Sequence, residues 1–186
     1  MLSTTSSPTF RTAGLAALAG GAAYAFAGAI QAVHGGFGGD HNTIDSTAEY
    51  LVTGALPVSI ALTIPAYRAL AQLGRAPRAG LAVIVAQAVL ALMTVVSVVN
   101  GEDAAVFNAV APLCLLTWLV GSVVIARGLT KTGAVPRPLA IALPLLLIAT
   151  FPLSPVGGPL LTGAFWLATG SLLAGLRTRA AAAQAA

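Results

Sequence analysis

The sequence has few charged residues and a large excess of apolar ones. Of its 186 residues, 8% are charged and 58% are hydrophobic, whereas an average soluble domain is about 25% charged and about 45–50% apolar. So few charges cannot cover the surface of a water-soluble globule of this size. Intrinsic disorder is excluded too, because it needs low hydrophobicity and a high net charge. The composition therefore predicts an integral membrane protein.

Cysteine is also scarce. The single cysteine, Cys114, excludes an intramolecular disulfide framework and any zinc site built from several cysteines. We expect it to pack as a small buried hydrophobic residue. The net charge is +4, which in a soluble protein might suggest nucleic-acid binding. Here the positions of the charges follow membrane topology instead, and we predict no nucleic-acid partner.

Long uncharged segments define the predicted fold. A helix needs about 20 apolar residues to cross a hydrocarbon core of roughly 30 Å. Six segments of the sequence are candidates, and the fifth of them, at about 139–153, is short and contains Pro144 and Pro152. No segment alternates polar and apolar residues, as strands of a membrane β-barrel do. We predict an all-α bundle between a flexible cytoplasmic tail (1–12) and a second cytoplasmic tail (178–186), with six spans at about 13–34, 50–73, 79–99, 104–126, 139–153 and 158–176.

The charges fix the predicted orientation. In a six-span arrangement all nine basic residues fall on one side of the membrane and all five acidic residues on the other. Five or seven spans would scatter the basic residues over both sides. The positive-inside rule then places both termini in the cytoplasm. The basic residues are Arg11, Arg68, Arg75, Arg78, Arg127, Lys131, Arg137, Arg177 and Arg179, and the acidic ones are Asp40, Asp45, Glu49, Glu102 and Asp103.

The first apolar segment has a second interpretation, as a cleaved signal peptide. Arg11 would form its basic start, and Ala25-Phe26-Ala27 would offer a cleavage site with small residues. The apolar stretch is longer than the 7–15 residues typical of a signal peptide. We therefore favour a retained first span.

Two cytoplasmic loops and two stripes of small residues suggest how the helices pack. Residues 74–78 (GRAPR) recur as 133–137 (GAVPR), which predicts a glycine at the end of one helix and a proline near the start of the next. Ala17, Gly21, Ala25 and Ala29 lie four residues apart, as do Ser171 and Gly175. Small residues at this spacing let helices approach closely in lipid.

Polar residues gather at the predicted outer face. His34, His41, Asp45 and Glu49 are candidate ligands for a small molecule or a transition metal such as zinc, and the histidines would also sense external pH. The competing interpretation is structural. Ser46 and Glu49 have the spacing of a capping box for the second span, and Asn100-Gly101 suits the end of the third.

Within the membrane, Gln87 is the clearest strongly polar residue. We expect its amide to bond to Thr63 or Thr117 on neighbouring spans. The aromatic residues Trp118 and Trp166 are expected to pack or to contact lipid. Proton-coupled transporters usually keep a carboxylate at this depth, and none is present here.

Other activities lack the residues they need. No acidic residue lies on the cytoplasmic side, where a Mg²⁺-dependent prenyltransferase or an ATP-driven pump would need carboxylates. No G-x-S-x-G motif supports a serine hydrolase. No catalytic residue, cofactor or cofactor-binding residue is implied.

A family resemblance is carried by four short patterns. These are residues 28–34 (GAIQAVH), the short polar outer loop, residues 67–70 (YRAL), and Trp166 to Gly170 before Arg177. The chain resembles small six-span integral membrane proteins of high-GC Gram-positive bacteria. That resemblance implies a multi-pass location in the bacterial plasma membrane, and it brings no defined activity.

The leading functional hypothesis is a non-enzymatic bundle that acts as an accessory, a scaffold or a small-molecule-binding protein. One alternative is a membrane enzyme acting on a lipid or quinone-like substrate at the outer leaflet, and another is a small facilitator or transporter with a path past Gln87. The expected partners are the lipid bilayer and a membrane protein or second copy of the chain. A pocket beneath the outer loop holding His34 and Glu49 would favour the enzyme, and tight packing throughout would favour the scaffold.

Overall fold

The described part of the chain consists of helices and the turns that join them. The computed structural model describes residues 9–34, 44, 46–102, 106–150 and 152–185, and no strand occurs among them. The predicted all-α fold is therefore confirmed. The elements are α1 (Thr9–His34), α2 (Thr47–Leu73), α3 (Pro77–Asn100), α4 (Phe107–Thr132), α5 (Arg137–Thr150), the short 3₁₀ helix η1 (Ser154–Val156) and α6 (Gly158–Ala185).

Four of these helices, α1 to α4, are long and apolar enough to cross a membrane. The fifth helix ends earlier than predicted. It was expected to reach residue 153 but ends at Thr150, two residues before Pro152. A proline has no backbone N–H with which to continue the hydrogen bonds of a helix. With 14 residues, α5 is about 21 Å long, shorter than the hydrocarbon core. The chain then turns through η1 and enters α6.

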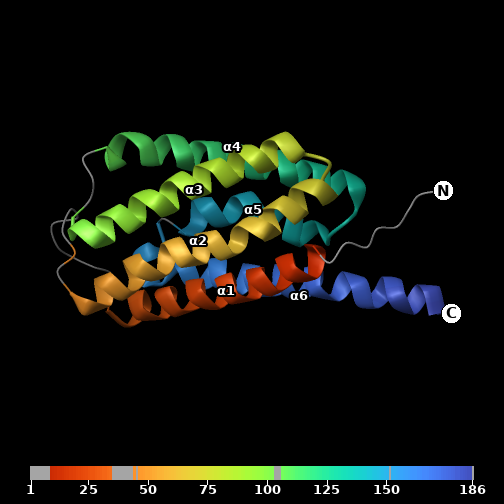
Figure 1. Ribbon diagram of the computed structural model, residues 1–186, viewed down its shortest axis with the longest axis horizontal. Helices are drawn as coiled ribbons and strands as arrows, with labels where there is room; N and C mark the ends of the chain where they lie inside the picture. Colours follow the sequence, from red (N-terminus) through yellow and green to blue (C-terminus); the bar gives the residue numbers. More distant parts are fainter. Residues whose placement is uncertain (1–8, 35–43, 45, 103–105, 151, 186) are drawn as a thin grey trace.

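Consecutive helices run antiparallel and pack side by side, and α6 returns to lie along α1 (Figure 1). The six helices therefore close into a ring. One end of the bundle, the arginine end, carries Arg75 in the turn after α2 and Arg78 and Arg137 in the first turns of α3 and α5 (Figure 1). The opposite end, the acidic end, carries Glu49 and Glu102. The charges in the described ranges are thus separated along the bundle, as the sequence predicted.

The outward faces of the bundle are apolar. On α3, Leu81 and Leu92 are 63% and 65% exposed, and on α4 Leu113 is 66% exposed. Polar side chains such as Ser59, Thr63 and Ser97 are buried instead, and their hydroxyls donate to carbonyls of their own helices. A bundle in water would reverse this arrangement. The surface fits a lipid solvent.

Glycines seven residues apart hold α1 against α6. A Cβ at Gly14 would lie 2.8 Å from the Gly170 carbonyl oxygen, and one at Gly21 would lie 2.9 Å from that of Gly163. The expected stripe with four-residue spacing was only partly right, because Ala29 at its end is exposed. Seven residues complete nearly two turns and stay on one seam, whereas a four-residue step drifts around the helix.

The stripe expected on α6 was also wrong. Ser171 is exposed, and a Cβ added at Gly175 would meet no atom within 4 Å. A different face of α6, the one that carries Gly163 and Gly170, contacts α1. Small residues at the right spacing therefore did not identify the packed face by themselves.

The two repeated loops end their helices differently. Gly133 has a φ of 64° and closes α4 in the left-handed conformation, as predicted, and Gly101 closes α3 in the same way with a φ of 73°. Gly74 does not, because the left-handed residue of that turn is Arg75, with a φ of 53°. Gly74 instead gives room for α4, since a Cβ at Gly74 would lie 3.0 Å from the Ile125 carbonyl oxygen.

Candidate functional site

Two members of the predicted outer cluster, His34 and Glu49, are described, and both lie at the acidic end of the bundle. His34 is the last residue of α1 and is exposed. The Ser46 amide donates to Glu49 Oε2 at 2.9 Å, and the Glu49 amide donates to Ser46 Oγ at 3.2 Å. The predicted capping box is therefore confirmed.

The rest of the outer cluster lies outside the described residues, namely His41 and Asp45. Within the part of the chain that the structure describes, no three histidine, cysteine, aspartate or glutamate side chains gather as metal ligands would. The described geometry thus gives no support to a metal site built on His34 and Glu49.

Gln87 is fully buried on α3, but it does not make the predicted bond. Neither its Nε2 nor its Oε1 atom has a hydrogen-bond partner among the described residues. The two expected partners bond within their own helices: Thr63 donates to the Ile60 carbonyl and Thr117 to the Leu113 carbonyl. Gln87 is also not among the residues that line the cavity described next.

A cavity of about 240 Å³ lies inside the ring of helices. All six helices and η1 contribute to its lining. It extends from Gln31 and Phe107, near the acidic end, to Tyr67 and Trp118 in the middle of the bundle. None of its described lining residues is charged, and most are apolar; the aliphatic ones are Leu56, Ile60, Leu90, Ala111, Leu115, Leu143, Leu146, Leu147 and Pro159.

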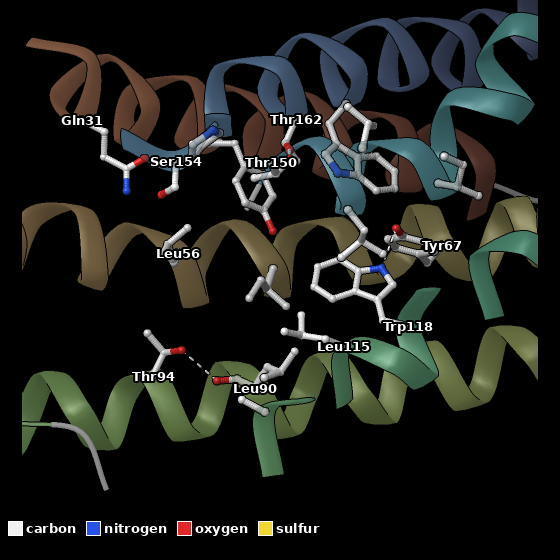
Figure 2. A pocket seen from close by; sticks show the side chains of 18 of the residues that line it. Gln31, Leu56, Tyr67, Leu90, Thr94, Leu115, Trp118, Thr150, Ser154 and Thr162 are labelled. Carbon is white, nitrogen blue, oxygen red and sulfur yellow. Dashed lines mark hydrogen bonds between the residues drawn. The ribbon is translucent and has the colours of Figure 1, made fainter. Parts of the chain in front are cut away.

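The inner end of the cavity is aromatic (Figure 2). Trp118 Nε1 donates to the Tyr67 hydroxyl at 2.7 Å, which joins α4 to α2. The Tyr67 ring also meets Trp166 of α6 edge to face, with centroids 4.9 Å apart. Such pairs are favoured by the aromatic quadrupole and fix the rings in place. The inner end is therefore a rigid surface with one satisfied polar pair.

The outer end of the cavity carries the other polar groups, from α1, α5, η1 and α6. Figure 2 shows Gln31, Thr150, Ser154 and Thr162 on one side of the space. The Thr150 and Thr162 hydroxyls bond to each other at 2.7 Å. Gln31 is 7% exposed, and its Oε1 atom has no hydrogen-bond partner among the described residues. Figure 2 shows the Gln31 amide nitrogen pointing into the space and the amide oxygen turned toward Ser154.

The early end of α5 helps to form this space. Because the helix stops at Thr150, the segment beyond it turns through η1, which packs on α1. Thr150 and Ser154 consequently lie at the outer end of the cavity. The small side chain of Ala111 on α4 leaves additional room.

Sequence reasoning missed the cavity, although it had noted several of its residues. Trp118 and Trp166 were expected to pack or to contact lipid; they are 8% and 2% exposed, so they pack inside the bundle and line the cavity. The available signals were two prolines in a short span, Pro144 and Pro152, and Gln31 close to the end of the first span. Neither signal shows that side chains from six helices leave a space between them.

Comparison of the chain with protein-family models, with curated protein sequences and with solved structures yields no match.

Proposed function

We propose that this chain is a six-span protein of the bacterial plasma membrane, with both termini in the cytoplasm, that binds a neutral apolar small molecule in the cavity of its helical ring. The membrane part of the proposal is supported by four helices of sufficient length and apolarity and by the leucines on the outward faces. The orientation is supported by the separation of arginines from carboxylates.

The binding part of the proposal depends on one observation, the cavity itself. Ligand sites are typically concave and mostly apolar, with a few polar groups that set orientation. At about 240 Å³, this cavity is larger than the roughly 150 Å³ apolar cavity that accepts benzene. A charged ligand would lose its hydration there without meeting an opposite charge, which is costly in a low-dielectric interior. The chemistry therefore favours a neutral ligand.

The other hypotheses receive less support. An enzyme using the outer cluster would need His34 and Glu49 in the cavity, and neither lines it. Transport past Gln87 would need that residue on a path through the bundle, yet it lies outside the cavity lining. A scaffold was expected to be tightly packed throughout, whereas this bundle contains a cavity.

Tryptophan fluorescence tests the proposal directly, because both tryptophans of the chain line the cavity. The protein is reconstituted in lipid nanodiscs and titrated with 1-bromooctane, whose bromine quenches tryptophan on contact. We expect saturable quenching. Simple partition into the bilayer would instead give quenching that rises without saturation, and that result would contradict the proposal.

Two matched variants locate the binding. Ala111→Phe fills part of the cavity, whereas Ala109→Phe places the same side chain on an exposed position of the same helix. Excluding two methylenes of a ligand costs about 1.6 kcal/mol, which is more than tenfold in affinity. We expect that loss for Ala111→Phe and none for Ala109→Phe. If Ala111→Phe does not fold, Leu115→Phe serves the same purpose. Equal affinities in folded variants would place the binding elsewhere.

A further inference from the structure

We infer that the ligand of the cavity carries an uncharged hydrogen-bond acceptor, namely a carbonyl oxygen, and that this oxygen accepts a hydrogen bond from Gln31 Nε2. The inference rests on the proposed function, because it names the chemical class of the molecule that the cavity takes. That class is a neutral apolar body with a carbonyl group at one end.

The Gln31 side chain presents a donor to the cavity. It lines the cavity and is 7% exposed. Figure 2 shows its amide nitrogen pointing into the space, while its oxygen is turned toward Ser154. The nitrogen has no hydrogen-bond partner in the described part of the chain. An amide nitrogen can only donate, and in lipid no bulk water is at hand to accept from it. A ligand acceptor at this point supplies the missing partner.

Two hydroxyls of the cavity lining, those of Tyr24 and Ser154, also lack a hydrogen-bond partner within the described ranges. A hydroxyl can donate or accept, whereas the Gln31 nitrogen can only donate. An acceptor on the ligand therefore suits all three groups. A ligand that could only donate would leave Gln31 Nε2 without a partner, so the unmet polar groups together favour an acceptor.

The acceptor is uncharged because the cavity offers no counterion. None of its described lining residues is charged, and burying a carboxylate or a phosphate without an opposite charge costs far more than burying a carbonyl. The threonines of the lining already take part in hydrogen bonds. Thr150 and Thr162 bond to each other, and Thr94 donates to the Leu90 carbonyl. The open donor of Gln31 therefore fits a neutral carbonyl oxygen.

The position of Gln31 orients the ligand. Gln31 lies three residues before the end of α1, near the acidic end of the bundle. The opposite end of the cavity is lined by Trp118 and Trp166. An elongated ligand would therefore place its carbonyl at Gln31 and its apolar body toward the tryptophans. A bromine at the end opposite the carbonyl would then lie close enough to quench them.

The test compares 8-bromooctan-2-one with 1-bromo-7-methyloctane, in which a methyl group replaces the carbonyl oxygen. Affinities are measured by tryptophan quenching in nanodiscs and referred to the probe concentration in the bilayer. We expect the ketone to bind about fivefold more tightly than the hydrocarbon, which is the effect of one net hydrogen bond. Gln31→Leu should reduce this ratio to about one and leave the affinity of the hydrocarbon within about twofold.

Gln87→Leu is the matched control. It removes the same type of side chain, also buried and without a partner among the described residues, from a position outside the cavity lining. The ketone-to-hydrocarbon ratio should remain about fivefold in this variant. An equal fall of the ratio in both variants would show a general effect and overturn the inference. If Gln31→Leu does not fold, Gln31→Met removes the donor with a more adaptable side chain.

Infrared spectroscopy tests the hydrogen bond itself. A carbonyl stretch moves to lower frequency when the oxygen accepts a hydrogen bond, and the difference between spectra of the carbon-13-labelled and unlabelled ketone isolates this band. We expect the lowered frequency in the wild-type protein and in Gln87→Leu, and its loss in Gln31→Leu. A shift lost only in Tyr24→Phe or Ser154→Ala would assign the donor to that hydroxyl and overturn the role of Gln31.

The outcomes separate the two proposals. Saturable quenching by both probes, with the same ratio in the wild type and in Gln31→Leu, would overturn the role of Gln31 and leave the binding function standing. Quenching without saturation by either probe in the wild-type protein would overturn the binding function itself.

Discussion

A single methyl group at Gly21 should separate the two helices that form one side of the cavity. A Cβ at this position would lie 2.8 Å from the Leu167 amide nitrogen and 2.9 Å from the Gly163 carbonyl oxygen. Both atoms belong to the backbone of α6, so no side-chain rotation relieves the contact. Helices α1 and α6 must move apart by about half an ångström to restore ordinary contact distances. Overpacking of this kind typically costs about 1–3 kcal/mol.

The measurement is the difference in unfolding free energy between Gly21→Ala and Gly54→Ala. Both substitutions gain helix propensity, about 0.5–1 kcal/mol, but a Cβ at Gly54 would meet no atom within 4 Å. The gain in helix propensity is the same in both variants, so the difference between their unfolding free energies measures the cost of the close contact between α1 and α6. Reversible unfolding in mixed detergent micelles, followed by tryptophan fluorescence, should show Gly21→Ala less stable than Gly54→Ala by about 1–3 kcal/mol. Equal stabilities would refute the close α1–α6 packing.

Three other predictions test separate features. Tyr67→Phe leaves the buried Trp118 Nε1 without its acceptor; we expect a loss of about 1 kcal/mol of stability and a shifted tryptophan emission, and unchanged values for both would contradict the bond. Ser46→Ala removes the cap of α2 and should cost about 1 kcal/mol in the same unfolding measurement, whereas Ser46→Thr should cost little; equal losses would argue against capping. In a chain whose native cysteine is replaced by alanine, an impermeant maleimide added outside intact cells should label Glu102→Cys but not Gln72→Cys, and the reverse pattern would overturn the orientation.

The course of the chain was predictable because the solvent imposes strong constraints on it. A bilayer demands long uncharged helices, and arginines and carboxylates separate across it. The boundaries of α2 and α3 fell within three residues of their predicted positions for this reason. The cap of α2 was predictable as well, since Ser46 and Glu49 form a local pattern that needs no tertiary information.

Features that depend on which faces of two helices contact each other were not predictable from the sequence. Gly74 and Gly133 occupy equivalent places in repeated loops, yet only Gly133 adopts the left-handed conformation. The backbone of Gly74 lies against Gly128 of α4, and no local pattern shows a contact between residues so far apart in sequence.

The cavity was missed for the same reason. Its volume is what remains after six helices have packed. Hydropathy predicts that Leu56 or Leu115 lies in the bilayer, but it does not distinguish a leucine that fills the core from one that lines an empty space. Gln31 was visible in the sequence as a polar residue near the end of a span. Its unpartnered Oε1 atom became evident only when the neighbouring helices were in place.

The most direct test of the central claim is native mass spectrometry of the protein taken from its own membrane in nanodiscs. We predict a wild-type species carrying one neutral molecule that survives removal of the surrounding lipid and is lost in Ala111→Phe, while Ala109→Phe retains it. If the wild type and both variants appear at their bare masses, or if all three carry the same adduct, the cavity is not a binding site.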